Sequence, residues 1–223
     1  MREAVVAIGL VVAVLAAAGV GIGLYSGGTS VEQVPAAQPQ EASDGYTQSL
    51  ALSDEEARSI LFMREEEKLA RDVYLTLYEM YGLQVFKNIA ESEQRHMDAV
   101  LTLIEKYNLT DPAQPEVGVF TNETLQELYN TLIERASKSV VDAIMVGALI
   151  EEKDIIDINK LINESSNPDV IRVFSNLVNG SANHLREFAS QYERLTGEPY
   201  TPQLLSADKY EAVLESAEAG PRP

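Results

Sequence analysis

Apolar residues recur at spacings of three and four along the chain from about Ser53 onward, and this spacing is typical of amphipathic helices. Four long segments and two short ones show the pattern: 53–81, 85–107, 122–135, 139–162, 168–195 and 206–217. No run of β-branched residues alternates with polar residues between turn signals, as a strand would require. The pattern therefore predicts an all-α fold.

Local signals at the ends of these segments agree with their lengths. Ser53 and Glu56 have the spacing of a capping box, Gly82 suits a helix end, and Pro168 suits a first helical turn. Two connections between the long helices are short, whereas the crossover at about 108–138 is long and contains its own helix. This order predicts a four-helix bundle with an extra helix in the long crossover.

The N-terminal segment has a different character. Ala4 to Tyr25 is an apolar run without a charged residue. A helix of this length spans the hydrocarbon core of a bilayer, about 30 Å thick, so we expect an N-terminal transmembrane helix to precede the bundle. A cleaved signal peptide is the alternative, although its apolar region is usually shorter. Both interpretations place the rest of the chain outside the cytoplasm, membrane-anchored or secreted.

The residues after this run are rich in Gly, Ser, Pro, Gln and Ala and lack a helical period, as expected of a flexible tether. The chain is therefore divided into four predicted parts: an anchor or signal peptide (1–25), a linker (26–48), a four-helix bundle (49–200), and a short C-terminal helix with its tail (201–223).

Composition removes several classes of function. The chain has no Cys, which excludes disulfides, thiolate nucleophiles, zinc fingers and iron–sulfur clusters. Its net charge of -18 offers no basic patch for phosphate, so nucleic acid is not an expected partner. Any bound metal would need carboxylate and imidazole ligands.

Polar residues interrupt the apolar stripe of every long helix near its middle. They are Glu67 on the first helix, Glu93 and His96 on the second, Glu151 on the third, and Ser181 and His184 on the fourth. A buried, unpaired carboxylate costs several kcal/mol, so a bundle tolerates one only when it is paired or bound to metal. The spacing of Glu93 and His96 places both on one helix face, where they can bind one ion.

Each of these residues also has an ordinary interpretation. An inward-facing histidine is often a hydrogen-bonded core residue, and acidic helices frequently contain Glu-x-x-His by chance. The segment "REEEKLARD", Arg64 to Asp72, could be a solvated face with pairs such as Glu67 and Arg71. The metal interpretation rests on coincidence, because four helices carry ligand-type residues at matching depth and both histidines fall there.

Several segments resemble the ferritin-like superfamily, and the rubrerythrins in particular. They are "EKLARDVY", "IAESEQRH", "IEEKD" and "HLREF". The longer strings "MREEEKLARDVY", "SEQRHMDAV", "VGALIEEKDIID" and "GSANHLREF" are similar to a prokaryotic domain-of-unknown-function family classed as ferritin-like, over about residues 50–200. The resemblance implies a metal site whose ligands are Glu67, Glu93, His96, Glu151 and His184, with Glu66, Glu152 and Asp154 as further candidates.

The chain departs from the rubrerythrin pattern at Ser181, which stands where a second Glu-x-x-His would place its carboxylate. One metal position therefore lacks a charged ligand, and a mononuclear centre, an asymmetric dinuclear centre and a relic all stay open. The resemblance implies iron, with manganese or zinc as alternatives. The Cys-rich electron-delivery module of complete rubrerythrins is absent from this sequence.

Two functions follow from these observations. The first is an extracytoplasmic metal-binding protein that oxidises ferrous ion, or reduces peroxide or oxygen with an external donor that the sequence does not identify. The second is a non-catalytic, surface-displayed helical interaction module without metal, whose polar groups pair among themselves, for example His184 with Glu93. The sequence leaves a homodimer open and assigns no catalytic residue.

Overall fold

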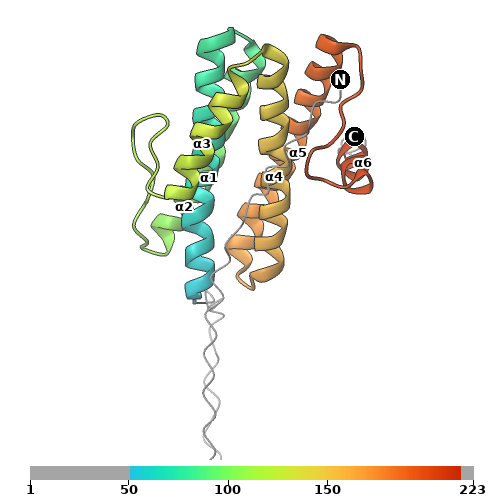
Figure 1. Cartoon of the computed structure of the whole chain (residues 1–223). Coiled ribbons are helices and arrows are strands. Elements are labelled where there is room, and N and C mark those ends of the chain that lie inside the picture. The colour runs from blue at the N-terminus through green and yellow to red at the C-terminus, as the bar shows by residue number, and fades with distance from the viewer. Residues whose placement is uncertain (1–50, 217–223) are drawn as a thin grey trace, which may run out of the picture. The chain divides into compact units, whose positions relative to one another are not determined.

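The structure, a computed structural model, describes residues 51–216, and the regular structure in that range is helical (Figure 1). The helices are α1 (Asp54–Tyr81), α2 (Gln84–Lys106), α3 (Glu123–Ala136), α4 (Val140–Glu164), α5 (Pro168–Thr196) and α6 (Ala207–Ser216). The chain is therefore all-α, as its periodicity predicts, and helix ends differ from the predicted ones by only a few residues.

The helix ends follow from local chemistry. The Ser53 side chain accepts a hydrogen bond from the Glu56 backbone N–H, and the Glu56 carboxylate accepts one from the Ser53 N–H, which confirms the capping box. Gly82 ends α1 with a left-handed φ of 67°, a conformation that glycine adopts without steric cost. The Asn167 side chain caps α5 just before Pro168.

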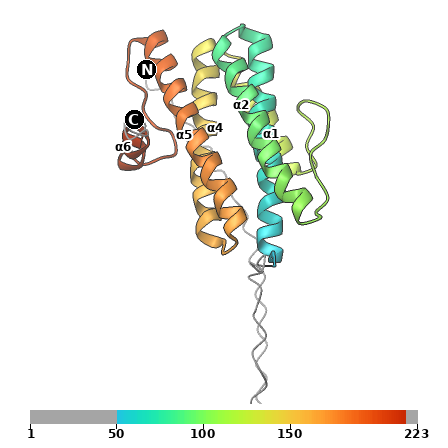
Figure 2. The same cartoon turned by 180° about the vertical axis from the view of Figure 1, so that it is seen from behind.

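The long helices pack in pairs. α1 lies against α2, α4 lies against α5, and the two pairs meet through α1 with α4 and α2 with α5 (Figures 1 and 2). The crossover helix α3 covers α1 and α4, and α6 contacts α5. Every long helix therefore has one face toward a shared interior.

The expectation that a transmembrane helix precedes the bundle is corrected by this structure. Among the described residues, 51–216, no helix combines the length and apolar character that crossing a membrane requires. The fold is a set of six helices over that range. The predicted span, Ala4 to Tyr25, and the predicted linker lie outside the described residues, and the location outside the cytoplasm that was inferred from them stays a prediction.

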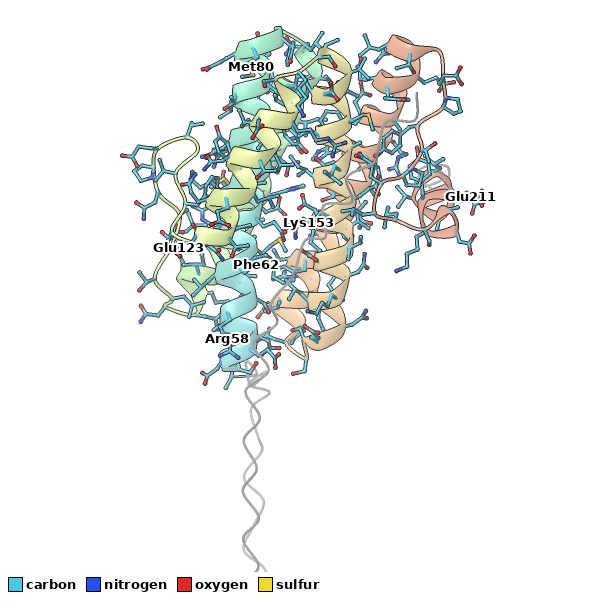
Figure 3. All side chains as sticks on the ribbon, in the orientation of Figure 1. Arg58, Phe62, Met80, Glu123, Lys153 and Glu211 are labelled. Carbon is cyan, nitrogen blue, oxygen red and sulfur yellow. The ribbon has the colours of Figure 1, made fainter. Side chains whose placement is uncertain are left out.

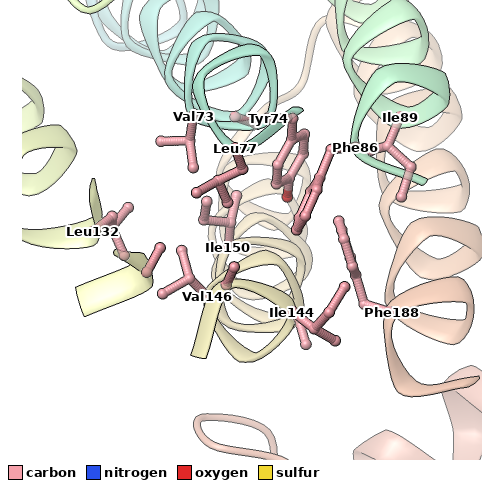
Figure 4. Close-up of a cluster of buried hydrophobic side chains, with 14 of the residues drawn as sticks. Val73, Tyr74, Leu77, Phe86, Ile89, Leu132, Ile144, Val146, Ile150 and Phe188 are labelled. Atoms are coloured by element: carbon pink, nitrogen blue, oxygen red, sulfur yellow. The ribbon is translucent and has the colours of Figure 1, made fainter. Parts of the chain in front are cut away.

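Two hydrophobic clusters occupy the interior. One contains Tyr74, Leu77, Phe86, Ile144 and Phe188, whose side chains converge from four helices (Figure 4). The other cluster, toward the opposite end of the bundle, includes Ile60, Met63, Val100, Ile158 and Phe174. Each buried large side chain contributes about 1.5–3 kcal/mol of burial free energy. Each long helix runs from one cluster to the other, so its middle lies between them.

Most residues of the predicted apolar stripes are buried or half-buried. Leu195, whose three-residue spacing from Tyr192 predicts that it faces inward with the stripe of the segment 168–195, is instead 45% exposed. It lies in the last turn of α5. The prediction was wrong there because a periodic pattern does not reveal where the neighbouring helices stop covering a helix end.

The charged segment of α1 is buried rather than solvated. All five residues from Arg64 to Lys68 are buried, and Arg71 pairs with Asp72 instead of Glu67. The Lys68 ammonium donates hydrogen bonds to Asp72 and to the backbone carbonyls of Glu116 and Val119 in the crossover. The solvated-face alternative is therefore wrong for this segment, because the crossover covers Lys68 while Glu66 and Glu67 face the other helices of the bundle.

Candidate metal site

The middle of the bundle holds a layer of buried charged side chains between the two hydrophobic clusters. Its members are Glu66 and Glu67 of α1, Glu93 and His96 of α2, Glu151, Lys153 and Asp154 of α4, and His184 of α5. We call this set the polar layer. Its position follows from the sequence, since these residues interrupt the apolar stripes where the helices cross between clusters.

One group in this layer is formed by α1 and α2. Nδ1 of His96 lies 3.1 Å from Oε2 of Glu67 and 2.7 Å from Oε2 of Glu93. Glu67 and Glu93 are fully buried, and the His96 side chain is 13% exposed. One ligand atom from each residue can thus approach a common point.

A second group adds α4 and α5. Nδ1 of His184 lies 2.7 Å from Oε1 of Glu93 and 3.4 Å from Oε2 of Glu151. The two imidazole rings are stacked, with centroids 5.5 Å apart. Glu93 therefore offers one oxygen to each histidine and stands between the two groups.

In each group the three ligand atoms lie within 4.8 Å of one another. The two groups, Glu67–Glu93–His96 and Glu93–Glu151–His184, share Glu93. A carboxylate shared in this way is the arrangement that lets one residue bridge two metal ions, and protein sites with two metals place them about 3.5–4 Å apart.

Several buried polar atoms here have no hydrogen-bond partner among residues 51–216. They are Oε2 of Glu66, Oε1 of Glu67, both carboxylate oxygens of Glu93, Oε2 of Glu151, Oδ2 of Asp154 and Nδ1 of His184. The His184–Glu93 contact is thus short but not aligned as a hydrogen bond. Orphaned buried atoms are costly, and a bound cation is one way to satisfy several of them together.

The pKa values of the buried carboxyls reflect burial first and the neighbouring charges second. Burial raises the pKa of Glu67 to about 8, although its contact with His96 opposes the shift. Burial would also raise the pKa of Glu93, but the charges of His184 and His96 outweigh it and hold that pKa below its ordinary range. Burial, followed by repulsion from Glu66 and Glu67, raises the pKa of Asp154 well above its ordinary value.

The pKa values of both histidines are raised, which favours their charged forms. Burial lowers the pKa of His96, but hydrogen bonding and attraction to Glu67 and Glu93 outweigh it and raise the value to about 11. For His184, the charges of Glu151 and Glu93 likewise outweigh burial and raise the pKa to about 10. Without metal, both imidazoles therefore carry protons and act as counter-ions to the carboxylates.

Charge balance tests whether a metal fits. In the described part of the chain, the polar layer has five carboxylates against three groups that can become cationic, namely His96, His184 and Lys153. If all five carboxylates were ionised, protonated histidines would leave an excess of negative charge, and burial accordingly raises the pKa of Glu66, Glu67 and Asp154 and favours their protonated forms. Divalent cations bound by neutral histidines would remove this excess, so the residues fit a metal site.

The three further candidate ligands, Glu66, Glu152 and Asp154, lie in different surroundings. Glu152 lies outside both groups, because its carboxylate accepts hydrogen bonds from Tyr200 Oη and from the backbone N–H groups of Gln203, Leu204 and Leu205. It holds the C-terminal segment against α4. Glu66 pairs with Lys153, as Oε1 lies 2.8 Å from Nζ. Asp154 is buried close enough to Glu67 and Glu93 to be perturbed by both.

Three neighbours of the ligand set also shape the site. The Tyr74 hydroxyl donates a 2.6 Å hydrogen bond to Oε1 of Glu151, so this core aromatic also orients a candidate ligand. Ser181 is fully buried and donates to the Leu177 carbonyl. Gly180, which sequence reasoning missed, leaves space for the His96 ring. The sequence signal that could have indicated Gly180 is the run of small residues at positions 180–182.

Known proteins are similar to this chain in sequence and in fold. Residues 56–217 match the family described as an uncharacterized protein domain, DUF2202. The chain belongs to this family. A relative, the uncharacterized protein MJ0754 of Methanocaldococcus jannaschii, is 52% identical over 167 residues, which cover 74% of this chain and 90% of the relative.

The similarity extends to an experimental structure. The crystal structure of hypothetical protein MJ0754 from Methanococcus jannaschii superimposes with a TM-score of 0.71 at 48% identity, covering 81% of this chain and 98% of that one. The predicted resemblance to a domain-of-unknown-function family is therefore confirmed. The names of these relatives state no activity, so the relation to ferritin-like proteins and the function remain matters of proposal.

Proposed function

We propose that this member of the DUF2202 family is a ferritin-like protein that binds two redox-active metal ions, iron foremost, at the polar layer. The observation that carries the proposal is the position of Glu93, which belongs to both ligand groups. The order of the bundle helices supports it as well, since one residue or pair comes from each of α1, α2, α4 and α5.

Each group supplies one position. Glu67 and His96 would hold the first ion, Glu151 and His184 would hold the second, and Glu93, which belongs to both groups, would serve both. Ligands of oxygen and imidazole nitrogen without thiolate suit iron, manganese or zinc. When bound, iron would supply one-electron chemistry toward oxygen or peroxide, which supports ferrous oxidation or the reduction of those oxidants by an external donor.

The chain's own residues keep the ligands in place. Tyr74 fixes one oxygen of Glu151, and its ring packs against Phe188 with centroids 5.3 Å apart. The two hydrophobic clusters close the site above and below and limit the access of water. Such supporting contacts typically change metal affinity 10–100-fold when they are removed.

The two positions are unequal. No carboxylate reaches the site from α5, where Ser181 is turned to the Leu177 carbonyl instead. Asp154, one helical turn after Glu151, is the buried carboxylate available to compensate on α4. The site is therefore asymmetric, and Asp154 lies beside it rather than in either ligand group.

The experiment is anaerobic reconstitution of the purified protein with ferrous ion, followed by metal analysis and thermal unfolding. We expect two iron ions per chain and a raised melting temperature, because a ligand that binds only the folded state stabilises it. Glu93→Gln should lose both ions, whereas Glu91→Gln, at an exposed position on α2, should keep them. Wild-type protein that retains no iron and shows no thermal shift would support the alternative, a metal-free module held by histidine–carboxylate pairs.

A further inference from the structure

A second charged group lies at the seam between α1 and α4, beside the ligands but outside both ligand groups. The Lys153 ammonium of α4 contacts Glu66 of α1 at 2.8 Å and also pairs with Asp157 one turn further along α4. The same ammonium lies 5.9 Å from the ring centre of Phe62 on α1 (Figure 3). We call Glu66, Lys153, Asp154 and Asp157 the Lys153 seam.

Burial increases inward along this seam. The side chains of Asp157 and Lys153 are 20% and 17% exposed, whereas the side chain of Glu66 is only 2% exposed. Asp154 is 1% exposed, and burial, with the charges of Glu66 and Glu67 adding to it, raises its pKa. Carboxylates therefore continue from partly exposed Asp157 to the ligand Glu67.

Two oxygens of the seam lack partners. Within residues 51–216, Oε2 of Glu66 and Oδ2 of Asp154 accept no hydrogen bond. Burying such oxygens without a partner is costly. Lys153 itself shows that the outer end of the seam holds a cation, since Glu66 and Asp157 bind its ammonium there.

Candidate ligands are also partly exposed on the α2–α5 face, where the side chains of His96 and His184 are 13% and 10% exposed. Among residues 51–216, this face has no acidic seam of the kind found on α1 and α4. The His96 ring fills the space over Gly180, where even a β-carbon would lie 2.3 Å from Nε2. No orphaned carboxylate outside the ligand groups lies on α2 or α5 in the described part of the chain. The acidic seam on α1 and α4 is therefore the better path for a cation.

We propose that the Lys153 seam is the entry route by which divalent metal ions reach the polar layer. This inference rests on the proposed function. The Lys153 ammonium occupies the outer cation position, and an entering ion displaces it from Glu66 and Asp157. The ion then passes to Glu66 and Asp154 and on to Glu67. The route would carry a small divalent cation, attracted by the buried oxygens of Glu66 and Asp154 that have no partner among residues 51–216.

The route is tested by the rate of metal loading, measured by mixing the purified full-length protein with Co²⁺ and following its visible absorption. Lys153→Met removes the competing ammonium, and we expect loading roughly 10-fold faster, in the range by which charged clefts change association rates. Glu66→Gln and Asp157→Asn should each slow loading several-fold, while the final amount of bound cobalt stays at the wild-type value.

Matched controls separate the seam from overall charge. Lys106→Met removes the same charge from the exposed pair of Lys106 with Asp169 and should load at the wild-type rate. Lys153→Arg keeps a cation at the seam and should not load faster. Circular dichroism checks that each variant remains helical, and the milder Asp157→Asn tests the route even where Lys153→Met does not fold.

The outcomes distinguish the two proposals. Wild-type cobalt stoichiometry with unchanged loading rates in Glu66→Gln, Asp157→Asn and Lys153→Met would overturn the entry route and leave the metal site standing. A wild-type protein that binds no cobalt would instead overturn the proposed function. Faster loading in Lys153→Met and slower loading in the two carboxylate variants, with Lys106→Met unchanged, would support the route.

Discussion

The imidazole of His96 lies directly over the backbone of Gly180. A β-carbon built at Gly180 would stand 2.3 Å from Nε2 and 2.5 Å from Cε1 of that ring. Real β-carbons do not approach other atoms so closely, so the His96 ring can keep this position only with glycine at position 180. The position of the candidate ligand His96 on α2 therefore depends on the glycine at position 180 on α5.

Gly180→Ala should displace His96 and weaken the first metal position. Alanine favours the interior of a helix by about 1 kcal/mol over glycine, but overpacking costs about 1–3 kcal/mol, so we expect a small net loss of stability. The ring must also leave Glu67 and Glu93, and we expect affinity at that position to fall at least 10-fold, as when supporting contacts are lost. Isothermal titration with ferrous ion measures this.

The matched control for Gly180→Ala is the neighbouring variant Ser181→Ala. The Ser181 hydroxyl is bonded to the Leu177 carbonyl and not to a candidate ligand, so both metal positions should be retained. If Gly180→Ala also binds two ions with wild-type affinity, His96 is not a ligand in the position assigned to it.

Tyr74→Phe should weaken the second metal position. Removing the hydroxyl leaves Oε1 of Glu151 buried without its donor, which costs about 1–3 kcal/mol of folding stability. The freed carboxylate is less well oriented, and we expect metal affinity to fall about 10-fold. Tyr81→Phe removes a hydroxyl that donates to the Ala136 carbonyl, far from the ligands. It should lose stability in urea denaturation but keep wild-type affinity, and equal affinity in both variants would contradict the assigned role of Tyr74.

Substitutions at the adjacent residues Glu151 and Glu152 should have different effects. Glu151→Gln should remove the second metal ion. Glu152→Gln should instead retain both ions and loosen the C-terminal segment, since Glu152 binds Tyr200 and the backbone at 203–205. Hydrogen exchange should show faster exchange at residues 203–205 in Glu152→Gln alone. Loss of metal in Glu152→Gln with retention in Glu151→Gln would reverse the assignment.

Glu56 should make stability depend on acid pH. Burial raises its pKa, but hydrogen bonds from Ser53, Ser165 and the Asn167 N–H outweigh burial and lower it to about 2. Because the folded pKa lies below the ordinary value of 4.5, the stabilisation is complete above about pH 4.5 and disappears as pH falls toward 2.

Glu56→Gln should therefore be less stable than wild type by up to about 3 kcal/mol at neutral pH, with the difference shrinking below pH 4.5. Urea unfolding at several pH values measures it. Glu55→Gln, at an exposed neighbouring position, should show no such dependence. A Glu56→Gln deficit that stays constant down to pH 2 would show that the carboxylate charge is not the cause.

The helices could be predicted from the sequence because their signals are local. The capping box of Ser53 with Glu56 and the stop at Gly82 act within a single turn, and the apolar stripes record which face is buried. The inward placement of Glu67, Glu93, His96, Glu151 and His184 was predictable for the same reason, since each interrupts a stripe. Their convergence required only that four long helices pack side by side.

What could not be predicted depends on contacts between distant segments. Glu152 is buried like Glu151, and only the C-terminal residues that bind it reveal that it belongs to another network. The burial of Arg64, Glu65 and Lys68 depends on the crossover, which lies about fifty residues further along the chain. The importance of Gly180 follows from the close approach of α2 and α5, which no periodic pattern encodes.

Anomalous scattering at the iron absorption edge distinguishes a pair of metal ions that would share Glu93 from a metal-free polar layer. Crystals of the protein reconstituted anaerobically with ferrous ion should give two peaks, one beside Glu67 and His96 and the other beside Glu151 and His184, with Glu93 between them. Iron-soaked crystals with no anomalous peak within the polar layer would contradict the account.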